Sequence, residues 1–195
     1  MTLVGFKQAT IQILDEDLKP VAGKKFVVKG ETNKGATSGF EITGLSPEAV
    51  KVYGSNAPYY VSQQGTGEVE ATFSALDLPS KIEHEVLGRT SGTNGVFHVG
   101  EKTVAPYCAI LFESADLRGQ KIGTGLYAGK FSRDAVSAET LNGDSYEPEA
   151  DEYKFTPIAK VIDSENQTVG FADSDSSFVA LETELFGTTT EGGNG

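Results

Sequence analysis

Glu68-Val69-Glu70-Ala71-Thr72-Phe73-Ser74-Ala75 (EVEATFSA) alternates polar and apolar side chains without a break. Successive side chains of an extended strand point to opposite faces of a sheet, so the four apolar residues share one face. The alternation predicts a half-buried strand whose other face is wet and acidic.

Strand signals recur along the rest of the chain, as alternating or apolar runs bounded by Gly, Asn and Asp. They cover residues 9–14, 25–29, 40–43, 97–99, 107–113, 122–132, 135–141, 153–162, 167–171 and 177–186. The polar segment 31–39 (ETNKGATSG) predicts a loop, and Asn94-Gly95 suits a tight turn.

One short amphipathic helix is predicted at about residues 78–87. Asp77 offers a capping side chain, Pro79 lies in the first turn, and Gly88 ends the segment. Its apolar residues are spaced by four: Leu78, Ile82 and Val86. Residues 46–50 also have helix-start chemistry but soon meet the turn signal at 54–56, which predicts a short helix or a turn. The fold class is therefore mainly β, a β-sandwich or partly closed barrel with one flanking helix and extended loops.

The composition of the chain argues against several classes of function. The 195 residues carry 16 basic and 28 acidic side chains, a net charge of -12, which argues against a grip on nucleic acid through phosphate contacts. No apolar run reaches the roughly 18 residues of a membrane span, and the start lacks a signal-peptide pattern. Residues 187–195 (GTTTEGGNG) predict a flexible C-terminal tail.

Candidate chemical sites are sparse. Cys108 lies in an apolar run and predicts a buried, inert thiol. Residues 123–129 resemble a phosphate loop, but no helix signal follows, which favours glycines at close packing sites. Residues 173–177 partly match a calcium loop without its glycine, which favours an acidic turn before a strand. His84 fits a solvated helix face and His98 is isolated, so zinc is not supported. The sequence predicts no catalytic, cofactor-binding or metal-binding residues, no cofactor and no enzyme.

Several segments occur in an order that resembles a known family. They are Val4-Gly5-Phe6-Lys7, residues 42–47 (ITGLSP), Val86-Leu87-Gly88-Arg89 followed by Asn94-Gly95, residues 100–107 (GEKTVAPY) and Gly129-Lys130-Phe131-Ser132. Together they are similar to the major tail tube proteins of long-tailed, non-contractile bacteriophages (siphophages), especially those of Gram-positive hosts. The resemblance covers about residues 1–160.

The resemblance implies a tail-tube-type β-sandwich, residues 1–162, followed by variable C-terminal strands or an arm in residues 163–195. It implies six subunits in a ring and rings stacked into a hollow tube that delivers phage DNA, which passes without specific binding. The expected partners are other copies of the chain, the tape measure protein, the tail terminator and distal tail or baseplate proteins, with no membrane. The expected location is the virion tail, after synthesis in the host bacterial cytoplasm.

Two sets of residues are predicted to serve this assembly. The first, on the wet side of the strand above, would face the lumen, where like charge keeps DNA phosphates from adhering. It comprises Glu68, Glu70, Thr72 and Ser74. The second, a polar loop, would form ring-to-ring contacts. It comprises Glu31, Thr32, Asn33, Lys34, Gly35, Ala36 and Thr37. A solvated outer face and an ordinary mobile loop are the respective alternatives.

Two other functions stay open on sequence alone. One is a tube protein of a type VI secretion-like machine, which belongs to the same structural class. The other is a β-sandwich that binds carbohydrate or a cell surface, for which the aromatic pair Tyr59-Tyr60 is the feature of interest, although tryptophan is absent.

Overall fold

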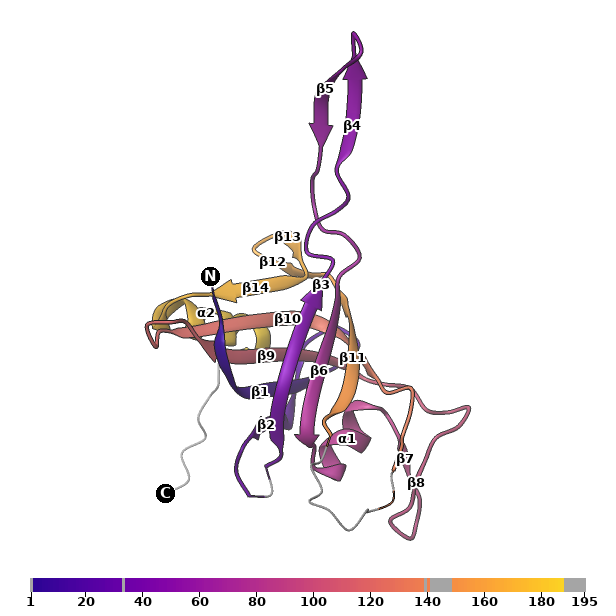
Figure 1. Cartoon of the computed structure of the whole chain (residues 1–195). Coiled ribbons are helices and arrows are strands. Elements are labelled where there is room, and N and C mark those ends of the chain that lie inside the picture. The colour runs from indigo at the N-terminus through magenta and orange to yellow at the C-terminus, as the bar shows by residue number, and fades with distance from the viewer. Residues whose placement is uncertain (1, 33, 139, 141–148, 188–195) are drawn as a thin grey trace.

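The computed structural model describes residues 2–32, 34–138, 140 and 149–187. Within them the chain forms 14 strands and two helices (Figure 1). The strands are β1 (Val4–Leu14), β2 (Pro20–Lys29), β3 (Ala36–Thr43), β4 (Val50–Gly54), β5 (Ala57–Ser62), β6 (Glu70–Asp77), β7 (Thr90–Ser91), β8 (Phe97–His98), β9 (Tyr107–Ala115), β10 (Lys121–Ser132), β11 (Asp151–Ile158), β12 (Lys160–Ile162), β13 (Glu165–Gln167) and β14 (Val169–Ala172). The helices are α1 (Ser80–Val86) and α2 (Asp175–Phe186). The predicted mainly-β class is confirmed.

Eight strands form one antiparallel sheet in the order β2-β1-β9-β10-β11-β6-β3, with β14 also paired to β10. Strand β10 turns the sheet, because residues 123–126 pair with β14 and residues 128–132 pair with β11. The end strand β3 returns toward β1, where the Thr37 hydroxyl donates to the Phe6 carbonyl oxygen at 3.4 Å. The rings of Phe6 and Phe40 meet edge-on there at 5.1 Å. The sheet is therefore a partly closed barrel, as predicted.

The main core lies inside this curved sheet. Ala71, Phe73 and Ala75 of β6 are buried, whereas Thr72 and Ser74 between them are only half-buried. The alternation of the EVEATFSA stretch thus gives a strand with one buried face, although β6 begins two residues later than Glu68. The Phe73 ring packs 6.1 Å from Phe112 of β9, which joins the two sides of the barrel.

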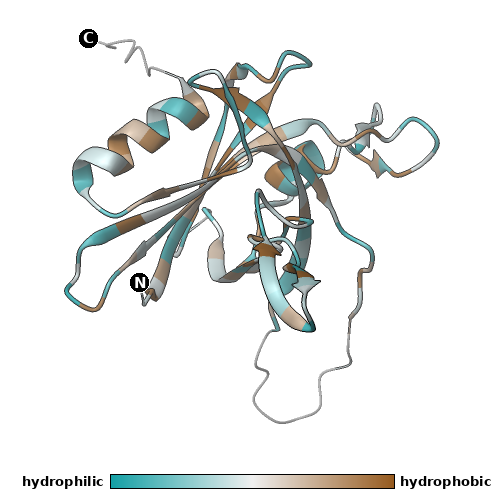
Figure 2. Cartoon of the chain, turned by 90° about the horizontal axis from the view of Figure 1, so that it is seen from above, coloured by the Kyte–Doolittle hydropathy of each residue, from teal (hydrophilic) through white to brown (hydrophobic). Residues whose placement is uncertain are grey.

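A second core lies on the outer face of the sheet under α2, and it corrects a prediction. Residues 177–186 were expected to form a strand, but Asp175–Phe186 is a helix that lies along one side of the strands (Figure 2). Ser174 caps the helix, accepting a hydrogen bond from the Ser177 amide, and Phe178, Leu181 and Leu185 are buried on one face at helical spacing. The acidic segment 173–177 therefore forms the cap and first turn of a helix instead of a turn before a strand.

The glycines of β10 make room for this packing. A Cβ at Gly123 would lie 2.8 Å from the Phe178 ring, and one at Gly125 would lie 2.7 Å from Leu185 Cδ1. A Cβ at Gly129, on the barrel side, would lie 2.5 Å from the Phe155 ring. The interpretation of residues 123–129 as close packing sites is confirmed, and they lie within a regular strand.

Three local predictions are wrong. Residues 46–49 form no helix, and strand β4 begins at Val50. The helix predicted at about residues 78–87 is confirmed as α1, but Asp77 does not cap it: the N-cap residue is Pro79, which makes no side-chain hydrogen bond. Residues 135–138 are not a strand, because they pair with no other strand in the described chain; residues 139 and 141 of that prediction lie outside the described residues. The predicted tail from residue 188 onward also lies outside them, and the predicted domain division at 162 stays a prediction.

Cys108 is fully buried, as predicted, and burial raises the pKa of its thiol from 9.0 to about 12. Burial also raises the pKa of the Tyr153 hydroxyl from 10.0 to about 12, and the nearby Glu83 carboxylate adds to this shift. Both groups keep their protons in the folded chain at a pH where the unfolded chain loses them.

This difference predicts alkaline destabilisation. Because the folded state binds more protons above pH 9, its free energy of unfolding should fall as pH rises toward 12, by about 1.4 kcal/mol per pH unit for each group. Urea unfolding at pH 8, 9.5 and 11 measures this fall. Replacing Cys108 by alanine should flatten the part between pH 9 and 10. A midpoint that stays constant up to pH 11 would contradict the assignment.

Candidate functional site

The described residues contain no group of three or more His, Cys, Asp and Glu side chains placed to hold a metal ion. Nor does any helix in this part of the chain have the length and hydrophobicity to cross a membrane. His84, predicted on a solvated face, is instead half-buried, and its ring stacks on Phe97 at 3.9 Å. Two surfaces are candidates for a functional role: a polar face of the sheet and a projecting hairpin.

The solvent side of β3, β6 and β11 forms one continuous surface, here called the open face. The strand register places Glu41 beside Thr72, and Thr72 beside Lys154, in a row across three strands. Its described side chains are Glu41, Thr43, Glu70, Thr72, Ser74, Glu152, Lys154 and Thr156. In Figure 1, β3 and β6 cross in front of β9 and β10, so the view is toward this side of the sheet.

The open face is acidic. It holds three carboxylates, those of Glu41, Glu70 and Glu152, against the ammonium of Lys154. The Lys154 Nζ lies 2.7 Å from Asp134 Oδ2, and this hydrogen bond raises the pKa of Lys154. A shallow cleft of about 260 Å³ lies between Glu41, Glu70 and Lys154. Such a surface offers no apolar anchor for a partner and disfavours contact with polyanions.

The residues predicted from the alternating stretch lie on or beside this surface. Glu70, Thr72 and Ser74 belong to the open face, and Glu68 is exposed just before β6. Sequence reasoning did not find Glu41 and Glu152, because it gave no means of telling which strands flank β6. The alternation of residues 151–156 carried a signal, since Tyr153 and Phe155 are buried between exposed neighbours.

The predicted contact loop, residues 31–37, is short and is held by ion pairs within the chain. The Glu31 carboxylate lies 2.6 Å from Lys29 Nζ and 2.7 Å from Lys34 Nζ, and hydrogen bonds from these two lysines lower the pKa of Glu31. Thr32 and Lys34 are exposed, whereas Gly35 is buried against Asp77. Ala36 and Thr37 already belong to β3, and Asn33 lies outside the described residues.

The element that projects farthest is the β4–β5 hairpin, which stands clear of the body (Figure 1). Its turn uses Ser55 and Asn56, both at positive φ, which is the backbone of a tight two-residue hairpin. Six large apolar side chains on it are between 49% and 86% exposed: Val50, Val52, Tyr53, Tyr59, Tyr60 and Val61. The described chain therefore leaves about half or more of each of these side chains uncovered.

Both faces of this hairpin are apolar. Val52 lies opposite Tyr60 on one face, and Tyr53 lies opposite Pro58 on the other. A strand with one dry side alternates apolar with polar residues, whereas a strand covered on both sides does not. A two-stranded hairpin is marginally stable in water by itself. The hairpin thus exposes apolar side chains on both of its faces.

Comparison with known protein families identifies the family of this chain. The family model of the phage tail tube protein matches residues 1–192. No curated protein matches the chain. The match spans the barrel, the hairpin and α2 alike, so the chain belongs to the phage tail tube protein family.

Proposed function

We propose that this structural tail protein closes into rings of six subunits, which stack into the hollow tube through which phage DNA reaches the host. The observation that carries the proposal is the β4–β5 hairpin, whose two apolar faces lack partners in the described chain. We take a second copy of the chain as the partner that covers the hairpin, because a tail tube protein assembles with itself. Tape measure, terminator and distal tail proteins would bind the tube at its axis or ends.

Within such a ring we assign the open face to the channel wall. Its carboxylates repel the phosphate backbone, so DNA can slide past without adhering. Helix α2 covers the outer face of the sheet over β9, β10 and β14, which leaves the outer side of β3, β6 and β11 as a broad bare sheet surface. Glu70, Thr72 and Ser74 would then face the lumen, with Glu68 at its margin.

Negative-stain electron microscopy of the concentrated protein tests the proposal. Hollow tubes are expected, and more of them at higher salt, because the net charge of -12 makes copies repel each other and salt screens that repulsion. Particles that remain monomeric at high concentration and high salt would contradict self-assembly.

Placement of the open face can be tested by labelling. In Thr72→Cys tubes, a maleimide carrying a long polymer should react at least tenfold more slowly than with the monomer, because the channel excludes the polymer, whereas small maleimides still enter. Val179→Cys on α2, 62% exposed, is the control and should react alike in both states. Equal polymer labelling of Thr72→Cys in tube and monomer would place the open face outside.

We also propose that the 31–37 loop takes part in ring-to-ring contacts. Lys34→Glu is expected to lower the amount of pelleted tube several-fold, because it puts a like charge beside Glu31 at the contact, while the unfolding midpoint falls only slightly, as expected for the loss of an exposed ion pair. Lys19→Glu is the matched control, since Lys19 is also an exposed lysine paired with a carboxylate, that of Asp17, in another turn. Equal pelleting of both variants would remove the loop from the contact.

A further inference from the structure

A second projection, here called the lateral arm, comprises residues 90–105 between α1 and β9 and contains β7 and β8. It leaves the body on the side away from α2 in both Figure 1 and Figure 2. Three of its valines are strongly exposed: Val96 at 54%, Val99 at 73% and Val104 at 67%. An arm with three uncovered valines has the composition of a contact surface.

Side-chain contacts connect the lateral arm to α1. Phe97 stacks on His84 of α1, and Arg89 donates to the His84 ring at 3.2 Å. Arg89 also pairs with Glu83 at 3.0 Å. The chain closes on itself farther out, where the Thr103 amide donates to the Gly100 carbonyl oxygen at 2.9 Å. A preformed arm loses little conformational entropy on docking.

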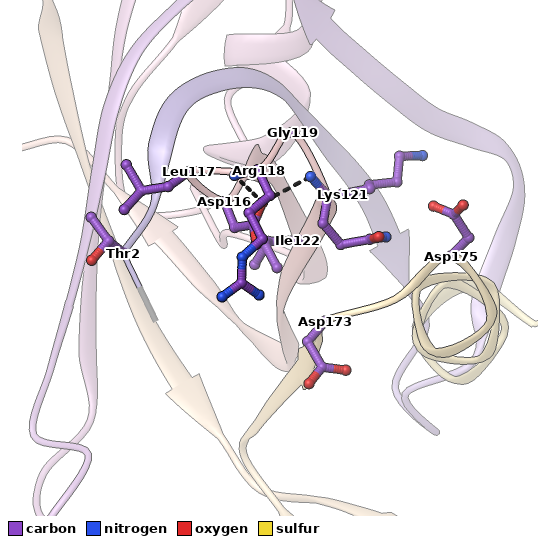
Figure 3. A pocket seen from close by; sticks show the side chains of 10 residues that line it. Thr2, Asp116, Leu117, Arg118, Gly119, Lys121, Ile122, Asp173 and Asp175 are labelled. Carbon is purple, nitrogen blue, oxygen red and sulfur yellow. Dashed lines mark hydrogen bonds between the residues drawn. The ribbon is translucent and has the colours of Figure 1, made fainter.

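The opposite side of the molecule carries a groove of about 880 Å³, formed by the β9–β10 turn, residue 2 and the start of α2 (Figure 3). The Asp116 carboxylate fixes the turn by accepting from the Arg118 and Gln120 amides at 2.7 and 2.8 Å. Leu117 is 76% exposed at the rim, so the groove has an apolar contact point. Arg118 extends from the turn, and Asp173 and Asp175 come from the other wall.

A ring of identical subunits needs two different, complementary patches on opposite sides of each copy. We propose that the lateral arm of one copy docks in the Asp116–Lys121 groove of the next copy around the ring. Val99 and Val104 would cover Leu117. The exposed pair Glu101-Lys102 offers one charge of each sign, and the groove offers both opposites, with Arg118 for Glu101 and Asp173 or Asp175 for Lys102. The inference rests on the proposed ring assembly.

Disulfide trapping tests this contact in assembled protein. The double variant Val104→Cys with Leu117→Cys should give, on oxidation of tubes, a ladder of cross-linked species on a denaturing gel that ends at a closed ring. Val104→Cys with Val136→Cys, which is 75% exposed elsewhere, is the control and should give no ladder. The native Cys108 is buried and stays silent in both. A control ladder equal to that of the test pair would overturn the proposal.

A charge exchange gives a second readout. Lys102→Glu and Asp173→Lys should each lower the amount of tube about tenfold at fixed concentration, and the double variant should recover most of it. Tubes that form from the unmodified chain but show neither cross-linking nor this exchange would overturn the lateral contact alone. If the unmodified chain forms no rings or tubes at all, the proposed function fails with it.

Discussion

Replacing Gly44 by valine is expected to lower the free energy of unfolding by about 3–5 kcal/mol. Gly44 follows β3 at the point where the chain leaves the barrel for the hairpin, and its φ is +71°. A β-branched residue is strained in that region, and its Cβ would overlap the backbone carbonyl of Glu68. The overlap is with backbone on the returning segment, so a rotamer change cannot relieve it. Urea unfolding followed by circular dichroism measures the loss.

The matched control is Gly39→Val in β3, the strand that precedes Gly44. Gly39 has no atom within 4 Å of an added Cβ and its φ is not positive, so valine should change stability by less than about 1 kcal/mol. If Gly44→Val does not accumulate as folded protein, Gly44→Ala keeps the same backbone conflict with a smaller side chain. A Gly44→Ala variant as stable as Gly39→Val would show that the crossing at the hairpin base is not tight.

The contrast between EVEATFSA and the C-terminal segment shows what local pattern can predict. The former has the period of two that only a half-buried strand satisfies. In residues 177–186 the apolar residues are Phe178, Val179, Ala180, Leu181, Leu185 and Phe186, a clustered run that suits either a strand or a helix. Two features favour the helix over a strand. Ser174 caps its first turn, a role that the sequence already suggests, and the glycines of β10 leave room for its side chains, which only the fold reveals.

The hairpin was missed for a different reason. Apolar side chains lie on both faces of the hairpin, so its strands lack the polar–apolar alternation by which a half-buried strand can be detected. Part of the open face was predicted. The polar–apolar alternation of β6 was enough to place Glu70, Thr72 and Ser74 on one exposed face. Glu41 and Glu152 required the antiparallel register with β3 and β11, and that information is long-range.

Removing aromatic anchors from the hairpin should have the largest effect on assembly. Tyr53 and Tyr60 lie on opposite faces and are 65% and 59% exposed, so Tyr53→Ser/Tyr60→Ser removes one anchor from each face. Buried aromatic hot spots contribute about 2 kcal/mol or more each, which predicts at least a roughly thirtyfold loss of tube per anchor. The monomer should unfold at a nearly unchanged urea concentration, because both side chains are mostly exposed on their own chain. Sedimentation of tubes at fixed protein concentration measures the loss.

The single variants decide how the hairpin is covered. If both of its faces are buried between copies, Tyr53→Ser and Tyr60→Ser each impair assembly, whereas a hairpin lying flat on one copy is sensitive on one face only. Phe171→Ser is the matched control, because Phe171 is an aromatic residue of equal exposure, 58%, on β14 of the barrel. Its loss should leave the tube yield within twofold. Normal assembly of the Tyr53→Ser/Tyr60→Ser protein would mean that the exposed apolar hairpin is not a contact between copies, and the proposal would lose the observation that carries it.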